Sequence, residues 1–396
     1  MTPLNKQAIV VGAGLAGAAA ARALAERGWQ INVFDMAPEV CSGGSGVPVG
    51  VLSCHVSVDD NPLSQLTRAG VQTTRQFAQS HLESATDWLG NGVLERRLTP
   101  EGADKKPWQA PAQGDVWHDH LHLATDEQLT QAGLSASGTQ ALWQAQGGWI
   151  KPQALVQALL KHDNILVFTR AEVESMHRQA DGEWHLRVKN HISIPNMGSS
   201  HTYSTETAPH VVLALGAHTP DFLNQVLYVD HMGLHPIAGM VSWGLQHDAS
   251  SLPPFAVNGH GSFVGGVPTQ AGAAWYTGAT FERNTMQAAS DAAAHNENQQ
   301  RLAELLPAVE AQLQAQFADS GQVHAWTGVR CASVNRMPKV GPLDEQQFPG
   351  LHLLTAMGSR GLTLSLLCAD VLAAQMDKSK PPVSESLLKA MRCQLT

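Results

Sequence analysis

Residues 10–35 read "VVGAGLAGAAAARALAERGWQINVFD", and this stretch decides the fold. The short apolar run at 8–11 is typical of a buried parallel strand. Helical spacing over 15–27 and a second apolar run at 30–34 follow it directly. The stretch therefore predicts a βαβ unit at the start of the chain.

Three glycines and one acid in this stretch have the positions that dinucleotide binding requires. Gly12 allows a tight turn, Gly14 lets the backbone approach a pyrophosphate, and Gly17 lets the helix pack closely on the sheet. The helix N-terminus favours negative charge, and Asp35 ends the second strand, where a ribose hydroxyl needs an acceptor. Because strand, helix, second strand and acid all agree, we predict a dinucleotide site rather than an alanine-rich core helix after a glycine turn. The spacing fits FAD and NAD equally.

The size, charge and cysteine content of the chain limit the classes of protein to which it can belong. Its 396 residues are enough for two domains with sizeable cores. A net charge of −9 gives no global basic field that would attract nucleic acid or an anionic membrane. The five cysteines are scattered and lack C-x-x-C spacing, which argues against disulfides and zinc and favours a reducing, cytoplasmic location. We therefore expect no metal site, and we expect no membrane-spanning segment.

The middle of the chain shows further elements. Spacing over 61–88 predicts a helix, and the Pro-, Gly- and charge-rich residues 98–116 predict a loop. Pro152 is a favourable first residue for another helix. The elements predicted after it are a strand at 164–168, a hairpin of 172–179 and 183–188 around "ADGE", a loop at 193–209 and a strand at 210–217.

The order of these elements identifies the fold class. A βαβ unit followed much later by strand, hairpin and strand is typical of α/β folds with a glutathione-reductase-type, Rossmann-like FAD-binding domain. NAD dehydrogenases usually complete their sheet with further βα units. Strands at 235–245 and 273–284 and a helix at 287–306 predict a second, α+β domain with a mixed or antiparallel sheet. We predict a discontinuous FAD-binding domain over 1–80, 149–217 and 323–396, and a substrate domain over 81–148 and 218–322.

Six further stretches point to one family. They are "DNPLSQLTRAG" (60–70), "GGWIKPQALVQALL" (147–160), "VVLALGA" (211–217), "GATFERN" (278–284), "GVRCASVNRMPKVGP" (328–342) and "LTAMGSRGLTLSLLCADVLAAQ" (354–375). Together they resemble the D-amino-acid-oxidase-like family of FAD-dependent oxidoreductases, and within it the C-terminal FAD domain of the bifunctional tRNA 5-methylaminomethyl-2-thiouridine biosynthesis proteins. The sequence has no counterpart of the methyltransferase domain of those proteins, so we expect no methyltransferase activity.

The resemblance implies a bound FAD without a covalent link. Gly358 and Gly361 would let the backbone lie against the isoalloxazine ring, and the helix that begins near Leu362 would direct its N-terminus at the flavin. The cofactor-binding residues that we expect are Gly12, Ala13, Gly14, Leu15, Ala16, Gly17, Asp35, Ser45, Gly46, Val173, Gly216, Gly358, Ser359, Arg360, Gly361, Leu362 and Thr363.

Two features of the matching stretches leave alternatives open. In related sarcosine oxidases a cysteine in the region of Cys331 holds FAD covalently, whereas "VRCA" is a pattern of the tRNA-modifying group and implies a packed cysteine. Val47 and Pro48 stand where the family tends to have polar residues, and Met240 stands where it has glutamine. Because both elements border the flavin or the substrate cavity in the family, the sequence allows a more apolar cavity and a different substrate.

Arg330 is the expected substrate contact. Its planar guanidinium suits the carboxylate of an amino acid or an N-substituted glycine; a structural ion pair is the alternative. Tyr276 and Arg360 are weaker candidates for lining the cavity. No catalytic acid or base is assigned, because such enzymes need none if the amine binds unprotonated.

The expected reaction is oxidation of a C–N bond by hydride transfer to flavin N5. In the first of three functions, the substrate is 5-carboxymethylaminomethyl(-2-thio)uridine in tRNA, which loses its carboxymethyl group. In the second it is a free amino acid or N-methyl glycine, and in the third the protein binds flavin without catalysis. The electron acceptor, oxygen or another, and the oligomeric state stay open.

Overall fold

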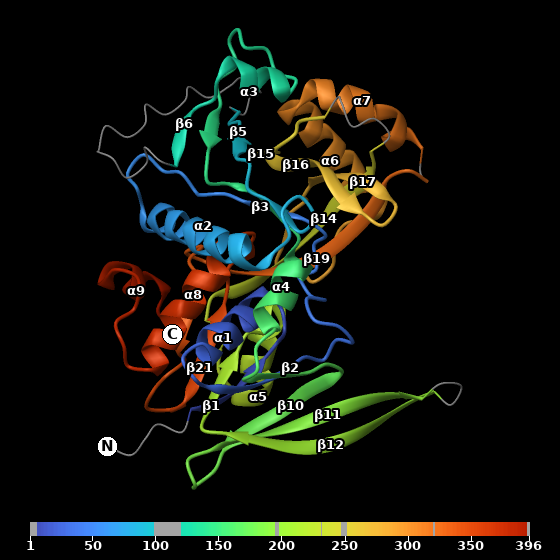
Figure 1. Cartoon of the computed structure of the whole chain (residues 1–396). Helices are drawn as coiled ribbons and strands as arrows, with labels where there is room; N and C mark the ends of the chain where they lie inside the picture. Colours follow the sequence, from blue (N-terminus) through green and yellow to red (C-terminus); the bar gives the residue numbers. More distant parts are fainter. Residues whose placement is uncertain are drawn as a thin grey trace. The chain divides into compact units, whose positions relative to one another are not determined.

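The structure is a computed structural model, and it forms two compact units (Figure 1). It describes residues 6–98, 120–194, 198–230, 232–246, 252–319 and 321–393. The first unit consists of Met1–Gly46, Pro152–Ile237 and Val329–Thr396, and the second of Val47–Lys151 and Ala238–Gly328. From residue 99 on, the loop predicted at 98–116 lies outside the described residues.

A six-stranded sheet is the frame of the first unit. Its order is β20-β21-β13-β1-β2-β9, and all neighbours pair in parallel except β20 and β21. The strands are β1 (Gln7–Val11), β2 (Gln30–Phe34), β9 (Ile165–Phe168), β13 (His210–Leu213), β20 (Lys339–Pro342) and β21 (Leu351–Thr355). The predicted βαβ unit is therefore present, with β1 at the centre of the sheet.

Three helices of the first unit pack together. Helix α1 (Leu15–Ala25) contacts both α4 (Pro152–Leu160) and α8 (Gly361–Met376). Helix α1 is rich in alanine and almost entirely buried, so its backbone can lie close to these neighbours. The unit also contains α5 (Thr219–Leu227) and α9 (Glu385–Met391).

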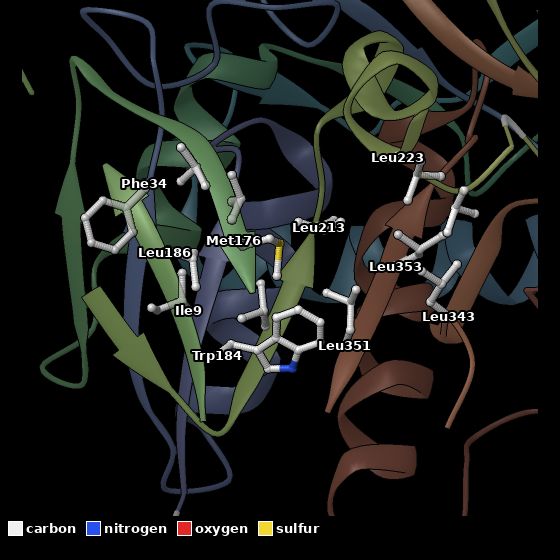
Figure 2. Close-up of a cluster of buried hydrophobic side chains, with 14 of the residues drawn as sticks. Ile9, Phe34, Met176, Trp184, Leu186, Leu213, Leu223, Leu343, Leu351 and Leu353 are labelled. Carbon is white, nitrogen blue, oxygen red and sulfur yellow. The ribbon is translucent and has the colours of Figure 1, made fainter. Parts of the chain in front are cut away.

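A second, three-stranded antiparallel sheet covers the six-stranded sheet. It consists of β10 (Ala171–Arg178), β11 (Trp184–Ile194) and β12 (Gly198–Ala208). Figure 2 shows the core between them, where Trp184, Leu186 and Met176 meet Ile9 and Leu351. The predicted hairpin is confirmed, but the loop predicted at 193–209 is wrong, because most of it is strand β12.

The second unit contains a nine-stranded mixed sheet. The path β18-β14-β17-β16-β15-β5-β7-β6 accounts for eight strands, and β19 pairs with β14. Their bounds are β5 (Val93–Glu95), β6 (Leu121–Leu123), β7 (Leu142–Gln144), β14 (Leu234–Leu245), β15 (Ala256–Gly259), β16 (Gly261–Thr269), β17 (Gly272–Gly278), β18 (Glu282–Arg283) and β19 (His324–Ser333). The chain passes between the two units within β14 and within β19.

Helices cover one face of this large sheet. Trp275 of β17 packs in a core with residues of α6 (Asp291–Leu305) and α7 (Pro307–Ala318), whereas its neighbour Tyr276 belongs to a different core on the opposite face. The remaining elements of the unit are α2 (Pro62–His81), α3 (Asp126–Gln131) and a small sheet of β3 (Gly50–Leu52), β8 (Gly148–Ile150) and β4 (Trp88–Leu89). Helix α2 ends at His81, before the predicted end at residue 88.

The compact units differ from the predicted domains by more than a few residues in two segments. Residues 47–80 lie in the second unit, because β3 pairs with β8 and the Arg75 guanidinium of α2 donates to the carbonyl oxygens of Gly90 and Gln146. Residues 218–237 lie in the first unit, because Leu223 of α5 is fully buried in the core of that unit. The compact units therefore divide the chain after residues 46 and 237, where the predicted domains divide it after 80 and 217, and the assignment of FAD and substrate binding to them stays a prediction.

Candidate active site

The carboxyl ends of four parallel strands meet at one edge of the six-stranded sheet. Gly12 follows β1, Asp35 follows β2, Gly216 follows β13 and Ala356 follows β21. The chain places β2 and β9 on one side of β1, then returns to place β13 on the other side. Ligands of open α/β sheets bind at such a reversal of strand order, so this edge is the candidate site.

The turn after β1 requires its glycines. Gly12 has a φ of +107°, and a Cβ there would lie 2.5 Å from the carbonyl oxygen of Ala214. A Cβ on Gly17 would collide with the carbonyl oxygen of Gly12, so only glycine lets the first turn of α1 lie against the β1 turn. These are the roles that the sequence predicts for the first and third glycines of the motif.

Asp35 is bound to this turn. Its carboxylate accepts the Ala13 N–H at 2.6 Å and the Ala37 N–H at 2.8 Å. A carboxylate has about four lone-pair positions, so these two bonds leave capacity for a further donor such as a ribose hydroxyl.

Helices α1 and α8 both begin at this edge with an N-terminus that favours an anion. Gly14 and Arg360 are their N-cap residues, neither forms a side-chain cap, and neither helix has an acidic residue in its first turn. The two N-termini are adjacent, since a Cβ on Gly361 would lie 3.2 Å from Cδ1 of Leu15. Bare backbone and two positive helix ends fit the pyrophosphate and ring of the FAD that the resemblance implies.

The loop at 41–46 closes one side of the site. The Leu15 N–H donates to Oγ of Ser45 at 3.0 Å, and the Cys41 N–H donates to the Ala13 carbonyl oxygen at 3.0 Å. A Cβ on Gly44 would collide with the carbonyl oxygen of Val329, so this loop also lies directly on β19. Gly44 is not among the predicted site residues, although the adjacent pair Gly43-Gly44 is a signal for close backbone approach.

The turn before α8 closes the other side. The Gly358 N–H donates to the Cys331 carbonyl oxygen at 2.9 Å, and Ala332 forms an isolated bridge with Met357. The 41–46 loop, β19, the 357–361 turn and the start of α1 thus form a continuous ring of contacts within the first unit. The expected segments around Gly12, Ser45, Arg330 and Gly358 are brought together.

The Cys331 side chain points away from these contacts, into the core of the first unit. It is 5% exposed and belongs to the hydrophobic cluster that contains Leu353 and Ala356. Burial raises the pKa of its thiol to about 11, although hydrogen bonds with Thr355 and Ala356 act in the opposite direction. The group is therefore a neutral thiol at physiological pH, and a neutral thiol is a poor nucleophile for attachment to a flavin.

Arg330 has the opposite orientation on β19. Side chains alternate along a strand, so the half-buried Arg330 lies on the face opposite Cys331, the same face as Ala332. The backbone next to Arg330 contacts the turn before α8, through the Cys331 carbonyl oxygen and the bridge of Ala332 with Met357, so Arg330 lies close to that turn along the strand.

Tyr276 lies in the second unit, on the face of the large sheet opposite α6 and α7. Its ring stacks on Trp243 with 6.0 Å between centroids, and burial raises the pKa of its hydroxyl. The same face carries the partly buried Val241. Tyr276 and Arg330 therefore come from different units, and their assignment to one substrate stays a prediction.

Met240 faces the other side of its strand. On β14, Trp243 stacks with Tyr276, whereas Ser242 lies 2.8 Å from Nδ1 of His295 on α6. By alternation, Met240 shares the side of Ser242, and it is fully buried there. Met240 thus gives no support for a more apolar cavity around Tyr276, and that argument rests on the half-buried Val47 and Pro48 alone.

The other expected cofactor residues differ in exposure. Val173 is buried in the core of the first unit, and Gly216 has a φ of +55° with open space around it. Ser359 is exposed, whereas Leu362 and Thr363 are buried. Ala16 and Gly46 complete the set: Ala16 lies in the first turn of α1, and a Cβ on Gly46 would lie 2.6 Å from the Cys41 carbonyl oxygen.

Two features are absent from the described part of the chain. It contains no group of three or more His, Cys, Asp or Glu residues that could hold a metal ion. Among the same residues, no helix combines the length and hydrophobicity needed to cross a membrane.

Solved structures have the same fold. Glycine oxidase from Geobacillus kaustophilus matches with a TM-score of 0.74 and 19% identity, over 99% of both chains. An L-amino acid deaminase from Proteus vulgaris matches with a TM-score of 0.70 and 18% identity, over 100% of this chain and 96% of that one. These matches confirm the predicted fold class.

Sequence relatives cover nearly the whole chain. Proteins named tRNA 5-methylaminomethyl-2-thiouridine biosynthesis bifunctional protein MnmC, from Polaromonas naphthalenivorans (strain CJ2) and Paracidovorax citrulli (strain AAC00-1), are 41% and 39% identical over 97% of this chain. The chain spans 59% of the length of each. Residues 7–375 match the family described as FAD dependent oxidoreductase. The resemblance predicted from the sequence is confirmed: the chain belongs to the FAD dependent oxidoreductase family.

Proposed function

We propose that this oxidoreductase removes the carboxymethyl group from a 5-carboxymethylaminomethyl uridine in tRNA, in the cytoplasm. The observation that carries the proposal is the 41% identity, over 97% of this chain, to a protein whose name states tRNA 5-methylaminomethyl-2-thiouridine biosynthesis. A methylaminomethyl group requires a free aminomethyl group to be methylated. Oxidative removal of a carboxymethyl substituent would supply it.

The proposed reaction balances as a two-electron oxidation followed by hydrolysis. The secondary amine R–NH–CH₂–COO⁻ loses a hydride from its α-carbon and a proton from its nitrogen, which gives the imine R–N=CH–COO⁻. Water then adds to the imine carbon, and the C–N bond breaks to release R–NH₂ and glyoxylate. Bound FAD would supply the hydride acceptor.

The chain's own residues would bind and orient both FAD and the substrate. The turn at Gly12–Gly17 and the α1 N-terminus would hold the pyrophosphate, and Asp35 a ribose hydroxyl. The α8 N-terminus would stabilise negative charge that develops on the ring. Arg330 would bind the carboxylate and fix the α-carbon relative to the ring, without a dedicated base in this chain.

A free amino acid or N-substituted glycine is the second candidate substrate. The net charge of −9 favours it, because tRNA binding draws on positive charge. Val47 and Pro48 favour it as well, because they are apolar where the family tends to have polar residues.

Anaerobic bleaching of the flavin separates the two substrates. We expect the purified protein to be reduced by tRNA that carries 5-carboxymethylaminomethyl uridine, with glyoxylate released in equal amount. The same tRNA without the modification is the control and should leave the flavin oxidised. Bleaching by glycine, N-methyl glycine or another free amino acid, with none by the modified tRNA, would reject the proposal in favour of the second candidate.

Cys331→Ser tests whether the flavin is held without a covalent bond. Because the Cys331 thiol is buried and neutral, we expect acid precipitation to release all flavin from the wild-type protein and from the variant alike. A buried hydroxyl in an apolar cluster should lower the free energy of unfolding by about 1–3 kcal/mol. Flavin that stays with the precipitated wild-type chain and leaves that of Cys331→Ser would instead identify a cysteinyl link.

A further inference from the structure

The two outer strands of the six-stranded sheet, β20 and β9, differ in their protection against a further strand. β20 carries Lys339 and ends at Pro342, and Lys339 Nζ donates to the Arg392 carbonyl oxygen of the C-terminal segment at 3.3 Å. Lysine and proline on an edge strand oppose pairing with another chain. In contrast, β9 and the residues that flank it, "NILVFT" at 164–169, contain no charge and no proline. This edge of the sheet is therefore unprotected.

The side chains of β9 are apolar and exposed. Leu166 is 58% exposed, Val167 36% and Phe168 41%. Successive side chains of a strand point to opposite faces, so both faces of the sheet are open at this edge. Strands of parallel sheets are ordinarily buried on both faces, and three consecutive exposed apolar side chains indicate a surface that a partner covers.

The backbone of β9 has a free donor and a free acceptor on its outer side. The Asn164 carbonyl oxygen accepts from the Ile31 N–H at 2.8 Å. The Phe168 carbonyl oxygen accepts from the Asp35 N–H at 2.9 Å, so the even-numbered residues of β9 bond to β2. Because the backbone alternates with a period of two, the N–H and C=O of Val167 point away from β2. Neither group has a hydrogen-bond partner among the described residues.

One charge of each sign lies beyond the two ends of β9. Asp163 precedes the strand and Arg170 follows it, and both side chains are exposed. Neither forms an ion pair with a described residue. A second β9 laid antiparallel would bring each Arg170 next to the Asp163 of the other copy, whereas a parallel one would bring like charges together. Charge complementarity at this edge therefore favours an antiparallel second copy.

We propose that two copies of this chain pair through β9, antiparallel about a two-fold axis at Val167, so that their six-stranded sheets join into one. Each Val167 N–H then donates to the Val167 carbonyl oxygen of the second copy, and Leu166 of one copy lies opposite Phe168 of the other. The occupant is a second copy because the backbone, the apolar side chains and the charges of this edge are all complementary to themselves under the same axis. The inference concerns assembly and does not depend on the substrate.

Sedimentation velocity over a series of protein concentrations tests the pairing of the backbone. We expect a dimer for the wild-type protein, and at least about tenfold weaker association for Val167→Pro, which removes the N–H donor and blocks the approach of a second strand. The Val167 N–H points away from β2, so this proline leaves the sheet of its own chain intact. Val167→Ile is the matched control, because it keeps the donor and the β-branched shape, and it should dimerise like wild type. Circular dichroism and flavin content should be the same in all three proteins.

Reversal of the two charges tests the antiparallel arrangement. Asp163→Arg and Arg170→Asp should each weaken the dimer about tenfold, because each brings like charges together at both ends of the interface. Aspartate tolerates the left-handed backbone of position 170, where φ is +56°. The double variant restores both ion pairs and should dimerise again. An equal mixture of the two single variants should also associate, since one copy then carries both cations and the other both carboxylates.

The results that would overturn the proposal are distinct. A wild-type protein that stays monomeric up to its highest concentration has no such dimer. A dimer that Val167→Pro and both charge reversals leave unchanged uses another surface. If the single charge variants are weakened but neither the double variant nor the mixture recovers, the two copies do not pair antiparallel through β9.

Discussion

Gly17→Ala should give a protein that purifies without FAD. The added Cβ would collide with the Gly12 carbonyl oxygen, and it would lie 3.3 Å from Cγ1 of Val10. These are backbone and core atoms that cannot rotate away, so α1 must move off the sheet. The turn proposed to receive the pyrophosphate would then lose its shape, and we expect FAD affinity to fall by at least about 100-fold. The forced fit should also cost about 3 kcal/mol of stability.

The ratio of flavin absorbance to protein absorbance measures this effect. Gly43→Ala is the matched control, because its Cβ would meet nothing within 4 Å in a nearby loop of the same unit. Gly14→Ala separates cofactor binding from folding, since its Cβ would meet only the Ser45 side chain, with Oγ at 2.9 Å. We expect Gly14→Ala to keep the wild-type circular dichroism spectrum and still lose FAD. Full flavin content in both Gly17→Ala and Gly14→Ala would remove the dinucleotide site from this turn.

The geometry of the glycine turn after β1 could be predicted from sequence because its requirements are local. The positive φ of Gly12, the close packing at Gly17 and the acid at the end of β2 are all fixed within one βαβ unit. Each of these requirements calls for one residue type at a fixed distance along the sequence. In the structure the two glycines and the acid have the positions that this spacing predicts.

The remaining contacts of the candidate site join segments that are distant in the sequence. The bond from the Leu15 N–H to Ser45 and the bond from the Gly358 N–H to the Cys331 carbonyl oxygen join loops that only the folded sheet brings together. A backbone carbonyl acceptor, such as that of Cys331, has no sequence signature at all. Only the family resemblance could predict that these segments belong to one site.

Strand β12 was missed because it lacks an apolar pattern. Its residues at 199–207 are mostly Ser and Thr, which favour turns when no partner strand is known. In the structure its backbone pairs with β11 along the whole length. This pairing satisfies the backbone hydrogen bonds of β12, so the strand does not need an alternating pattern of buried apolar side chains. Thr and Tyr are also favourable in strands, which outweighs the loop-like composition once β11 is present.

Arg330 is the residue whose loss should affect substrate binding most. A guanidinium that binds a carboxylate in a water-poor site contributes about 2–5 kcal/mol, much of it because the carboxylate would otherwise be desolvated without a partner. We therefore expect Arg330→Ala to raise the apparent Kd for a carboxylate substrate on the order of 100-fold. Arg330→Lys keeps the charge but loses the planar fork, so a rise of about tenfold is expected.

The division of the effect between KM and kcat gives the role of Arg330. The carboxylate carries the same charge before and during hydride loss, so a contact of equal strength in both states should raise KM and leave kcat nearly unchanged. FAD content should stay at the wild-type level in both variants, because Arg330 lies on β19 and not on either helix N-terminus. Arg392→Ala removes an exposed arginine of the same unit and is the control for net charge. If wild type, Arg330→Ala and Arg392→Ala are reduced with the same concentration dependence, Arg330 is structural. The substrate carboxylate must then be bound by another cation.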